Sequence, residues 1–84
     1  MMHLENQIRD YVNQNLLFGD SRVQYDDETS FLESGMVDSM GVMELVGFTN
    51  SAFGIQVEPM DITPENFDSV SRLAAYIRRK RKVS

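Results

Sequence analysis

The chain has 84 residues, of which 42% are hydrophobic and 25% charged, with a formal net charge of −5 and no cysteine. This size fits one domain, the hydrophobic content is too high for a disordered chain, and the lack of cysteine excludes disulfides, thiolate metal clusters and a cysteine nucleophile. The single histidine, His3, is a poor base for a serine nucleophile, so we expect no catalytic residue, no metal site and no enzyme activity of the chain itself.

Charge is unevenly distributed along the chain. Residues 1–77 contain all 13 acidic residues but only three of the eight basic ones, and the other five fall within residues 78–84. An acidic body repels nucleic acid and attracts basic protein surfaces, so we expect protein partners and no nucleic acid. We expect residues 78–84 to be a basic tail that ends the last helix, where cations complement the helix dipole, and that can fray. Nucleic-acid binding through this tail is the weaker alternative.

We expect neither a membrane span nor an export signal. No stretch approaches the ~18 consecutive apolar residues of a transmembrane helix. The first residues (MMHLE) lack the basic and apolar regions of a secretory signal. The sequence therefore predicts a cytoplasmic protein, and we expect it to act as a monomer.

The first helix is expected between Leu4 and Leu16. Apolar residues recur at positions 4, 8, 11, 12 and 16, which is the spacing of an amphipathic helix, and Gly19 is suited to end it. Residues 19–37 show no periodicity, so we expect a long loop there, with a short turn at Phe31-Leu32. Four apolar residues are expected to hold this loop against the core: Val23, Tyr25, Phe31 and Leu32.

A second helix is expected from Ser39 to Phe53, with Asp38 as its N-cap and Gly54 ending it. Its core-facing residues fall on one narrow arc at helical spacing: Val42, Leu45, Val46, Thr49 and Phe53. A short extended segment with Ile55 and Val57 follows and is closed by Pro59.

Two further helices complete the predicted fold. Thr63-Pro64-Glu65 resembles an N-cap followed by proline at the first helical position, which opens a single turn ending near Phe67. Ser69 or Asp68 then caps a last helix with apolar residues at positions 70, 73, 74 and 77. The fold class is therefore all-α: a four-helix bundle of three main helices and one short helix, with a long loop between the first two, in a single domain over residues 1–84.

Ser39 is the candidate functional residue. Its hydroxyl lies in the first turn of the expected second helix, directly after the acidic N-cap residue Asp38. The N-terminal end of a helix is electropositive, so a phosphodiester on this serine lies in a favourable field. The position fits an anchor for a phosphate-linked group, and it also fits a serine that merely suits the start of a helix.

With its elements in this order, the chain resembles the acyl carrier protein family and its relatives, the peptidyl and D-alanyl carriers, over roughly residues 4–78. The matching segments are FLESGMVDSM at 31–40, ELV at 44–46, FGI at 53–55, FDSV at 67–70 and LAAYI at 73–77. The resemblance implies an acyl-carrier-like four-helix bundle whose motif serine, here Ser39, carries 4′-phosphopantetheine transferred from coenzyme A by a phosphopantetheinyl transferase.

The family resemblance also implies a function. The terminal thiol of the arm holds an acyl or aminoacyl group as a thioester and presents it to partner enzymes, which are a loading ligase and downstream synthases of fatty-acid, polyketide or other specialised biosynthesis. Glu44 is the only acid in the helix after its N-cap, and aspartate rather than histidine precedes Ser39. These two departures from the fatty-acid and peptidyl-carrier patterns favour a specialised discrete carrier.

Four residues around Ser39 are candidates for partner recognition: Asp38, Met40, Met43 and Glu44. On a helical wheel, Met40 and Glu44 project opposite the core-facing residues and Met43 lies at their edge. Methionine adapts its shape to different partners, so exposed methionines beside an anchor fit a docking surface. Capping by Asp38 and partial packing of the methionines are the alternatives. Gly41 either lets a partner or the arm approach closely or is simply tolerated.

Two other functions remain open at this point. One is a small acidic helical adaptor that binds a basic protein and has no prosthetic group. The other is a degenerate carrier that keeps the fold as a structural subunit.

Overall fold

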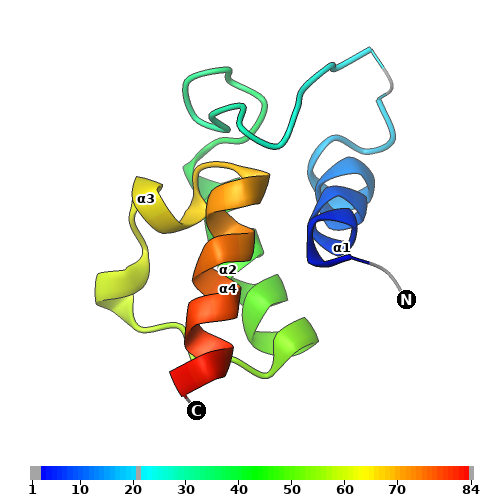
Figure 1. Cartoon of the computed structure of the whole chain (residues 1–84). Coiled ribbons are helices and arrows are strands. Elements are labelled where there is room, and N and C mark those ends of the chain that lie inside the picture. The colour runs from blue at the N-terminus through cyan, green and yellow to red at the C-terminus, as the bar shows by residue number, and fades with distance from the viewer. Residues whose placement is uncertain (1–2, 21, 84) are drawn as a thin grey trace.

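The computed structural model describes residues 3–20 and 22–83, and every regular element in these ranges is helical. The main helices are α1 (Leu4–Tyr11), α2 (Ser39–Phe53) and α4 (Val70–Val83), and α3 (Pro64–Phe67) is a single turn. Figure 1 shows the long loop after α1 crossing one end of the molecule, with α3 on one side of α4 and α1 on the other. The prediction of an all-α, four-helix fold is confirmed.

The first helix changes from an α-helix to a π-helix before it ends. α1 is continued by one π-helical turn, η1 (Val12–Leu16), and the chain then turns through Phe18 and Gly19, both at positive φ. Leu4, Ile8 and Val12 are buried on the side that faces the core. The predicted span is therefore helical throughout, but its last turn is wider than the α-helix that we expected.

The long loop is held by backbone hydrogen bonds to the start of α4. The Phe31 amide donates to the Asp68 carbonyl at 2.8 Å, and the Ser71 amide donates to the Asp27 carbonyl at 2.9 Å. Phe31 is fully buried, as expected, whereas Leu32 is exposed. Leu32 follows Phe31 in the turn but lies at the surface and does not pack against the core, so our expectation that it holds the loop there is wrong.

α2 begins and ends at the predicted residues. The Asp38 carboxylate accepts a hydrogen bond from the Gly41 amide at 2.8 Å, and Gly54 ends the helix with a φ of 64°. Leu45, Val46 and Thr49 are buried against the core. The two remaining residues of the expected core face, at the ends of the stripe, are only half-buried: Val42 and Phe53.

The segment after α2 contains one element that the sequence did not reveal. Ile55 is buried, and the chain then forms a 3-10 turn, η2 (Pro59–Asp61), where we expected the extended segment simply to close. α3 follows with Pro64 at its first position, as predicted. Thr63 lies at the N-cap position, but its hydroxyl makes no capping hydrogen bond.

α4 is capped by Ser69, whose hydroxyl accepts a hydrogen bond from the Arg72 amide at 3.1 Å. The four apolar residues predicted to face the core are fully buried: Val70, Leu73, Ala74 and Ile77. Near its C-terminal end, cations pair with acids of the body. Arg78 bonds both oxygens of Glu5 at 2.8 and 2.9 Å, and Lys80 lies 3.5 Å from Asp61. In the described part of the chain, no helix is both long and apolar enough to cross a membrane.

Candidate functional site

Ser39 is exposed and is the first residue of α2. Asp38 precedes it in an extended conformation and binds the Gly41 amide through its side chain and the Val42 amide through its carbonyl. The amides of Ser39 and Met40 come before the first residue that can reach a carbonyl of the preceding turn. The Ser39 hydroxyl therefore lies at an electropositive helix end, open to an approaching reagent.

Gly41 fixes how the start of α2 meets the rest of the molecule. It is buried, and a Cβ atom at this position would lie 2.6 Å from Val37 Cγ1 and 3.7 Å from Leu16 Cδ2. Val37 is itself buried, and its branched side chain has little freedom to move. Gly41 thus serves packing within the chain, which is a role that sequence reasoning did not consider.

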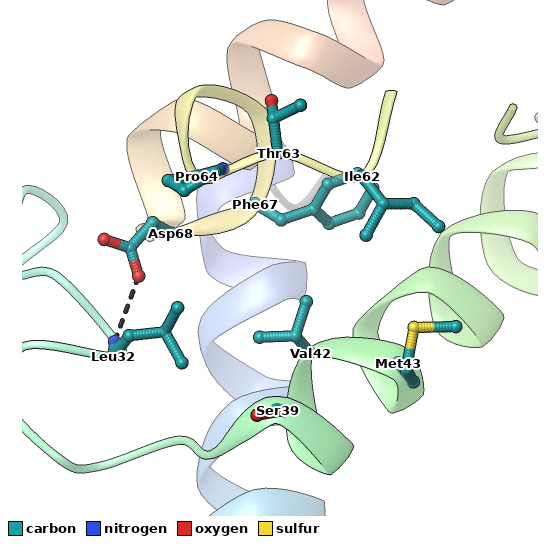
Figure 2. A pocket seen from close by; sticks show the side chains of 9 residues that line it. All are labelled: Leu32, Ser39, Val42, Met43, Ile62, Thr63, Pro64, Phe67 and Asp68. Atoms are coloured by element: carbon teal, nitrogen blue, oxygen red, sulfur yellow. Dashed lines mark hydrogen bonds between the residues drawn. The ribbon is translucent and has the colours of Figure 1, made fainter. Parts of the chain in front are cut away.

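An apolar hollow of about 280 Å³ lies beside Ser39 on the side facing α3, and we call it the α3-side hollow. Figure 2 shows Ser39 and Val42 at one edge, with Ile62 and Phe67 across from them. Leu32, Met43, Pro64, Thr63 and Asp68 complete its lining. Leu32 and Ile62 are site residues that sequence reasoning missed.

The main polar group around the α3-side hollow, the Asp68 carboxylate, already forms hydrogen bonds within the chain. The Asp68 carboxylate accepts hydrogen bonds from the Ser30 hydroxyl and from the Leu32 amide, the latter at 3.0 Å and drawn in Figure 2. The Thr63 hydroxyl is buried without a hydrogen-bond partner and points away from Ser39 in the same view. The surface next to Ser39 on this side is therefore almost entirely apolar.

Asp61 holds the outer wall of this hollow. Its carboxylate accepts a hydrogen bond from the Tyr76 hydroxyl at 2.8 Å, and its backbone carbonyl accepts one from the side-chain amide of Asn66 at 2.8 Å. The Tyr76 bond lowers the pKa of Asp61, with a further contribution from Lys80. Burial raises the pKa of Tyr76, and the bond to Asp61 raises it further. These contacts fix η2 and α3 on α4.

A second hollow, of about 340 Å³, lies at the start of α2 on the side of the first helix, and we call it the α1-side hollow. Its apolar lining includes Phe18, Met36 and Met40, and its lining also includes the carboxylates of Asp38 and Glu44. Phe18 is 85% exposed and Met40 is 78% exposed. Phe18 is a further residue that sequence reasoning missed, because a single aromatic residue in a loop carries no periodic signal.

The four predicted recognition residues are all exposed around Ser39, but they divide between the two hollows. Met43 lines the α3-side hollow, whereas Asp38, Met40 and Glu44 line the α1-side hollow. The Glu44 carbonyl accepts a hydrogen bond from the Tyr11 hydroxyl at 3.3 Å, which connects α1 to α2. The Tyr11 ring stacks on Phe48 at 4.2 Å between centroids, so this connection has both polar and aromatic contacts.

A small helical bundle that exposes a serine at the start of its second main helix is the architecture of a carrier protein. Residues 6–77 match the family described as "Phosphopantetheine attachment site". The chain is also 28% identical over 61 residues to a D-alanyl carrier protein from Abiotrophia defectiva, which covers 73% of this chain and 77% of that protein. The chain therefore belongs to the family of phosphopantetheine-carrying acyl and aminoacyl carrier proteins.

Membership of this family implies a covalently attached 4′-phosphopantetheine. The structure fits such a group: it offers an exposed hydroxyl at the N-terminal end of a 15-residue helix, and an apolar surface lies directly beside that hydroxyl. Proteins of this kind carry groups for other enzymes and are generally not catalysts themselves.

Proposed function

We propose that Ser39 carries the phosphopantetheine group, and that the chain shuttles acyl or aminoacyl groups between partner enzymes as thioesters. The observation that carries this proposal is the placement of Ser39. Its side chain is exposed at the first position of α2, inside the segment that matches the phosphopantetheine attachment family.

The residues around Ser39 prepare it for this role. Asp38 binds the Gly41 amide and so stabilises the first turn of α2. Because Gly41 has no side chain, this turn packs closely against Val37. The amides of Ser39 and Met40 at the helix start favour the negative charge of a phosphate attached to the Ser39 oxygen, which suits a phosphodiester. The chain thereby holds the anchor still while leaving it accessible.

The attached group supplies a terminal thiol that forms the thioester with the cargo. The chain itself encodes no cysteine, so we assign the loading and transfer reactions to other proteins. We propose as partners a phosphopantetheinyl transferase, a loading ligase and downstream synthases. The 13 acidic residues of the body favour basic faces on these enzymes, mainly by speeding encounter. We further propose that the chain acts as a monomer in the cytoplasm.

Two observations bear on the cargo. The apolar lining of the α3-side hollow favours an apolar acyl group, such as those of fatty-acid or polyketide synthesis. The similarity to a D-alanyl carrier protein favours an aminoacyl group and a specialised pathway. Intact mass of the chain purified from its native cell, before any thioester hydrolysis, distinguishes the two because it reports the attached group directly.

Attachment is tested by incubating the purified chain with coenzyme A and a phosphopantetheinyl transferase. We expect the intact mass to increase by one phosphopantetheinyl group and fragmentation to locate the addition at Ser39. Ser39→Ala should show no increase, and its helical circular dichroism and unfolding midpoint should match the wild type. Ser51→Ala is the matched control because Ser51 is an exposed serine of the same helix, and it should be modified normally.

Modification of Ser39→Ala would show that the group is attached elsewhere. A wild-type chain that stays unmodified with several transferases, and that is unmodified when purified from its own cell, would contradict the carrier function. That result would leave the acidic helical adaptor and the degenerate carrier as the functions to test.

A further inference from the structure

Phe18 is an aromatic residue held in solvent by an unfavourable backbone conformation. It is separated from the π-helical turn only by the C-cap residue Leu17, its φ is 53°, and its side chain is 85% exposed. Bulky residues rarely adopt positive φ because the side chain crowds the backbone. Neither burial nor ring stacking with another described residue compensates for this conformation. The fold thus places an aromatic ring at the surface at a cost to its own stability.

The position of Phe18 relative to Ser39 is fixed by packing. Leu16, at the end of η1, packs on Gly41 in the first turn of α2. This contact places the segment after η1 beside the start of α2, so that Phe18 and Met40 line the same hollow. Met40 directly follows Ser39 and is 78% exposed. Two large exposed apolar side chains therefore line one hollow at the start of α2, where Asp38 and Met40 adjoin Ser39 in the chain.

The charges around these two side chains have one sign. Asp38 and Glu44 line the α1-side hollow, and no lysine, arginine or histidine does. Arg22, the basic residue that follows Phe18 most closely in the chain, pairs with Asp20 at 3.0 Å. The surface therefore has an apolar centre and an anionic edge, which complements a face that presents an apolar recess beside lysine or arginine residues.

We propose that Phe18 extends the recognition residues predicted on α2 into a docking surface for the phosphopantetheinyl transferase, with Phe18 and Met40 as its apolar centre and Asp38 and Glu44 as its anionic edge. This inference rests on the proposed attachment at Ser39, and it adds the first loop to the recognition surface of α2. Through Phe18, the end of the first helix takes part in selecting the enzyme that modifies the chain.

The transferase is the partner that this position fits best. It must contact the Ser39 oxygen itself, so the surface next to that oxygen lies within its footprint, whereas the thiol on which other partners act lies at the far end of the attached arm. The transferase must also hold coenzyme A, whose several phosphates require cationic groups close to the reacting atom. An anionic edge beside Ser39 is complementary to such an enzyme.

The test compares Phe18→Asn and Met40→Ala with wild type in transferase assays with coenzyme A. Asparagine tolerates positive φ, so Phe18→Asn removes the ring without adding strain. We expect kcat/KM for modification to fall about tenfold in each variant, mainly through KM, as for loss of a buried contact at an interface. Met60→Ala is the matched control, because Met60 is 82% exposed and lines neither hollow, and it should react like wild type.

A binding measurement provides a readout that does not depend on turnover. The affinity of Ser39→Ala for the transferase is compared with that of the double variant Ser39→Ala/Phe18→Asn, and we expect the double variant to bind about tenfold more weakly. Phe18→Asn should at the same time be at least as stable as wild type in urea. A stability gain together with a docking loss is a combination that a purely structural role for Phe18 does not produce.

The outcomes separate this inference from the proposed function. A wild-type chain that is not modified contradicts attachment at Ser39. A wild-type chain that is modified, with Phe18→Asn and Met40→Ala indistinguishable from it in rate and affinity, overturns the docking surface alone. Concentration-dependent dimerisation that disappears in Phe18→Asn would show that a second copy covers this surface, and it would also overturn the inference.

Discussion

The two hollows beside Ser39 are similar in size but differ in construction. The α3-side hollow has walls that belong to the core: Phe67 is 1% exposed, and the segment before it is tied to α4 through Asp61 and Tyr76. The α1-side hollow is bordered by side chains that extend into solvent, chiefly Phe18 and Met40. The α3-side hollow therefore has a buried wall with Leu32 and Met43 exposed at its rim, whereas the α1-side hollow has the more exposed apolar side chains, Phe18 and Met40.

This difference shows how a small chain gives one serine two environments. An apolar residue that is buried stabilises the fold and cannot also be offered to a partner, whereas an exposed one contributes little to stability and is available for binding. The same residue types therefore have different roles on the two sides of α2. Substitutions of the same residue type on the two sides of α2 test whether one side serves stability and the other serves partner binding.

The largest expected contrast is between two phenylalanines. Phe67→Ala should lower the free energy of unfolding by about 3–5 kcal/mol, because the ring is buried in the core and its loss leaves a cavity. Phe18→Ala should change it by no more than about 0.5 kcal/mol, because the ring is exposed. Urea unfolding followed by circular dichroism measures both. Equal losses in the two variants would show that Phe18 is packed and that the contrast is wrong.

The next contrast is between two glycines of α2. A Cβ at Gly41 lies 2.6 Å from Val37 Cγ1, whereas a Cβ at Gly47 meets nothing within 4 Å. Gly47→Ala should stabilise the chain by about 1 kcal/mol through helix propensity. Gly41→Ala receives the same benefit but overpacks the start of α2, so it should be less stable than Gly47→Ala by about 1–3 kcal/mol.

The same unfolding measurement checks this pair. Equal stabilisation by both alanines would show that Val37 moves aside freely, and that Gly41 does not position the α1-side hollow.

A smaller effect is expected when a charge is reversed at the anionic edge, which consists of Asp38 and Glu44. Glu44→Lys reverses a charge beside Met40 and should slow modification of Ser39 severalfold at low salt. Glu28→Lys changes the net charge equally at an exposed loop position that lines neither hollow. Initial rates of mass increase at several salt concentrations compare the two variants. If Glu28→Lys slows the reaction as much as Glu44→Lys does, net charge rather than the edge governs encounter.

The smallest effect concerns pH and the wall of the α3-side hollow. The Tyr76 hydrogen bond holds the pKa of Asp61 below its ordinary value of 3.8, so this contact stabilises the fold above that pH and the benefit is lost as pH falls through the lowered pKa. Tyr76→Phe should raise the pKa of Asp61 towards 3.8 and weaken the acid dependence of unfolding. NMR titration of the Asp61 carboxyl measures the shift, and an unchanged pKa would show that Tyr76 does not set it.

The sequence predicted best where a local rule decides the structure. Asp38, Gly54 and Pro64 each act through their own backbone neighbours, and each marks a helix boundary where the structure has one. The burial of Leu45 and Leu73 followed from helical periodicity because both residues face the centre of the bundle.

The predictions from sequence were wrong or incomplete where contacts between distant segments determine the structure. The π-helical turn (Val12–Leu16) brings Leu16 onto Gly41, and no pattern within the first helix indicates that contact. Leu32 was expected to hold the loop but lines the α3-side hollow, because the Asp68 carboxylate binds its amide and fixes the turn. Phe18 was overlooked because a strained, exposed aromatic residue is the opposite of what a propensity rule predicts.

The pairing at the end of α4 has a consequence for how the molecule meets its partners. Arg78 and Lys80 are held by Glu5 and Asp61, so the first residues of the basic segment are attached to the body, and the last of its residues lie outside the described side chains. Figure 1 shows the C-terminal end of α4 at the opposite end of the molecule from the loop that leads into α2. Because the acids near Ser39 lie far from this basic end, we expect the carrier to be electrically polarised along its length. In the field of a cationic enzyme it experiences a torque that turns its serine end forward before contact is made.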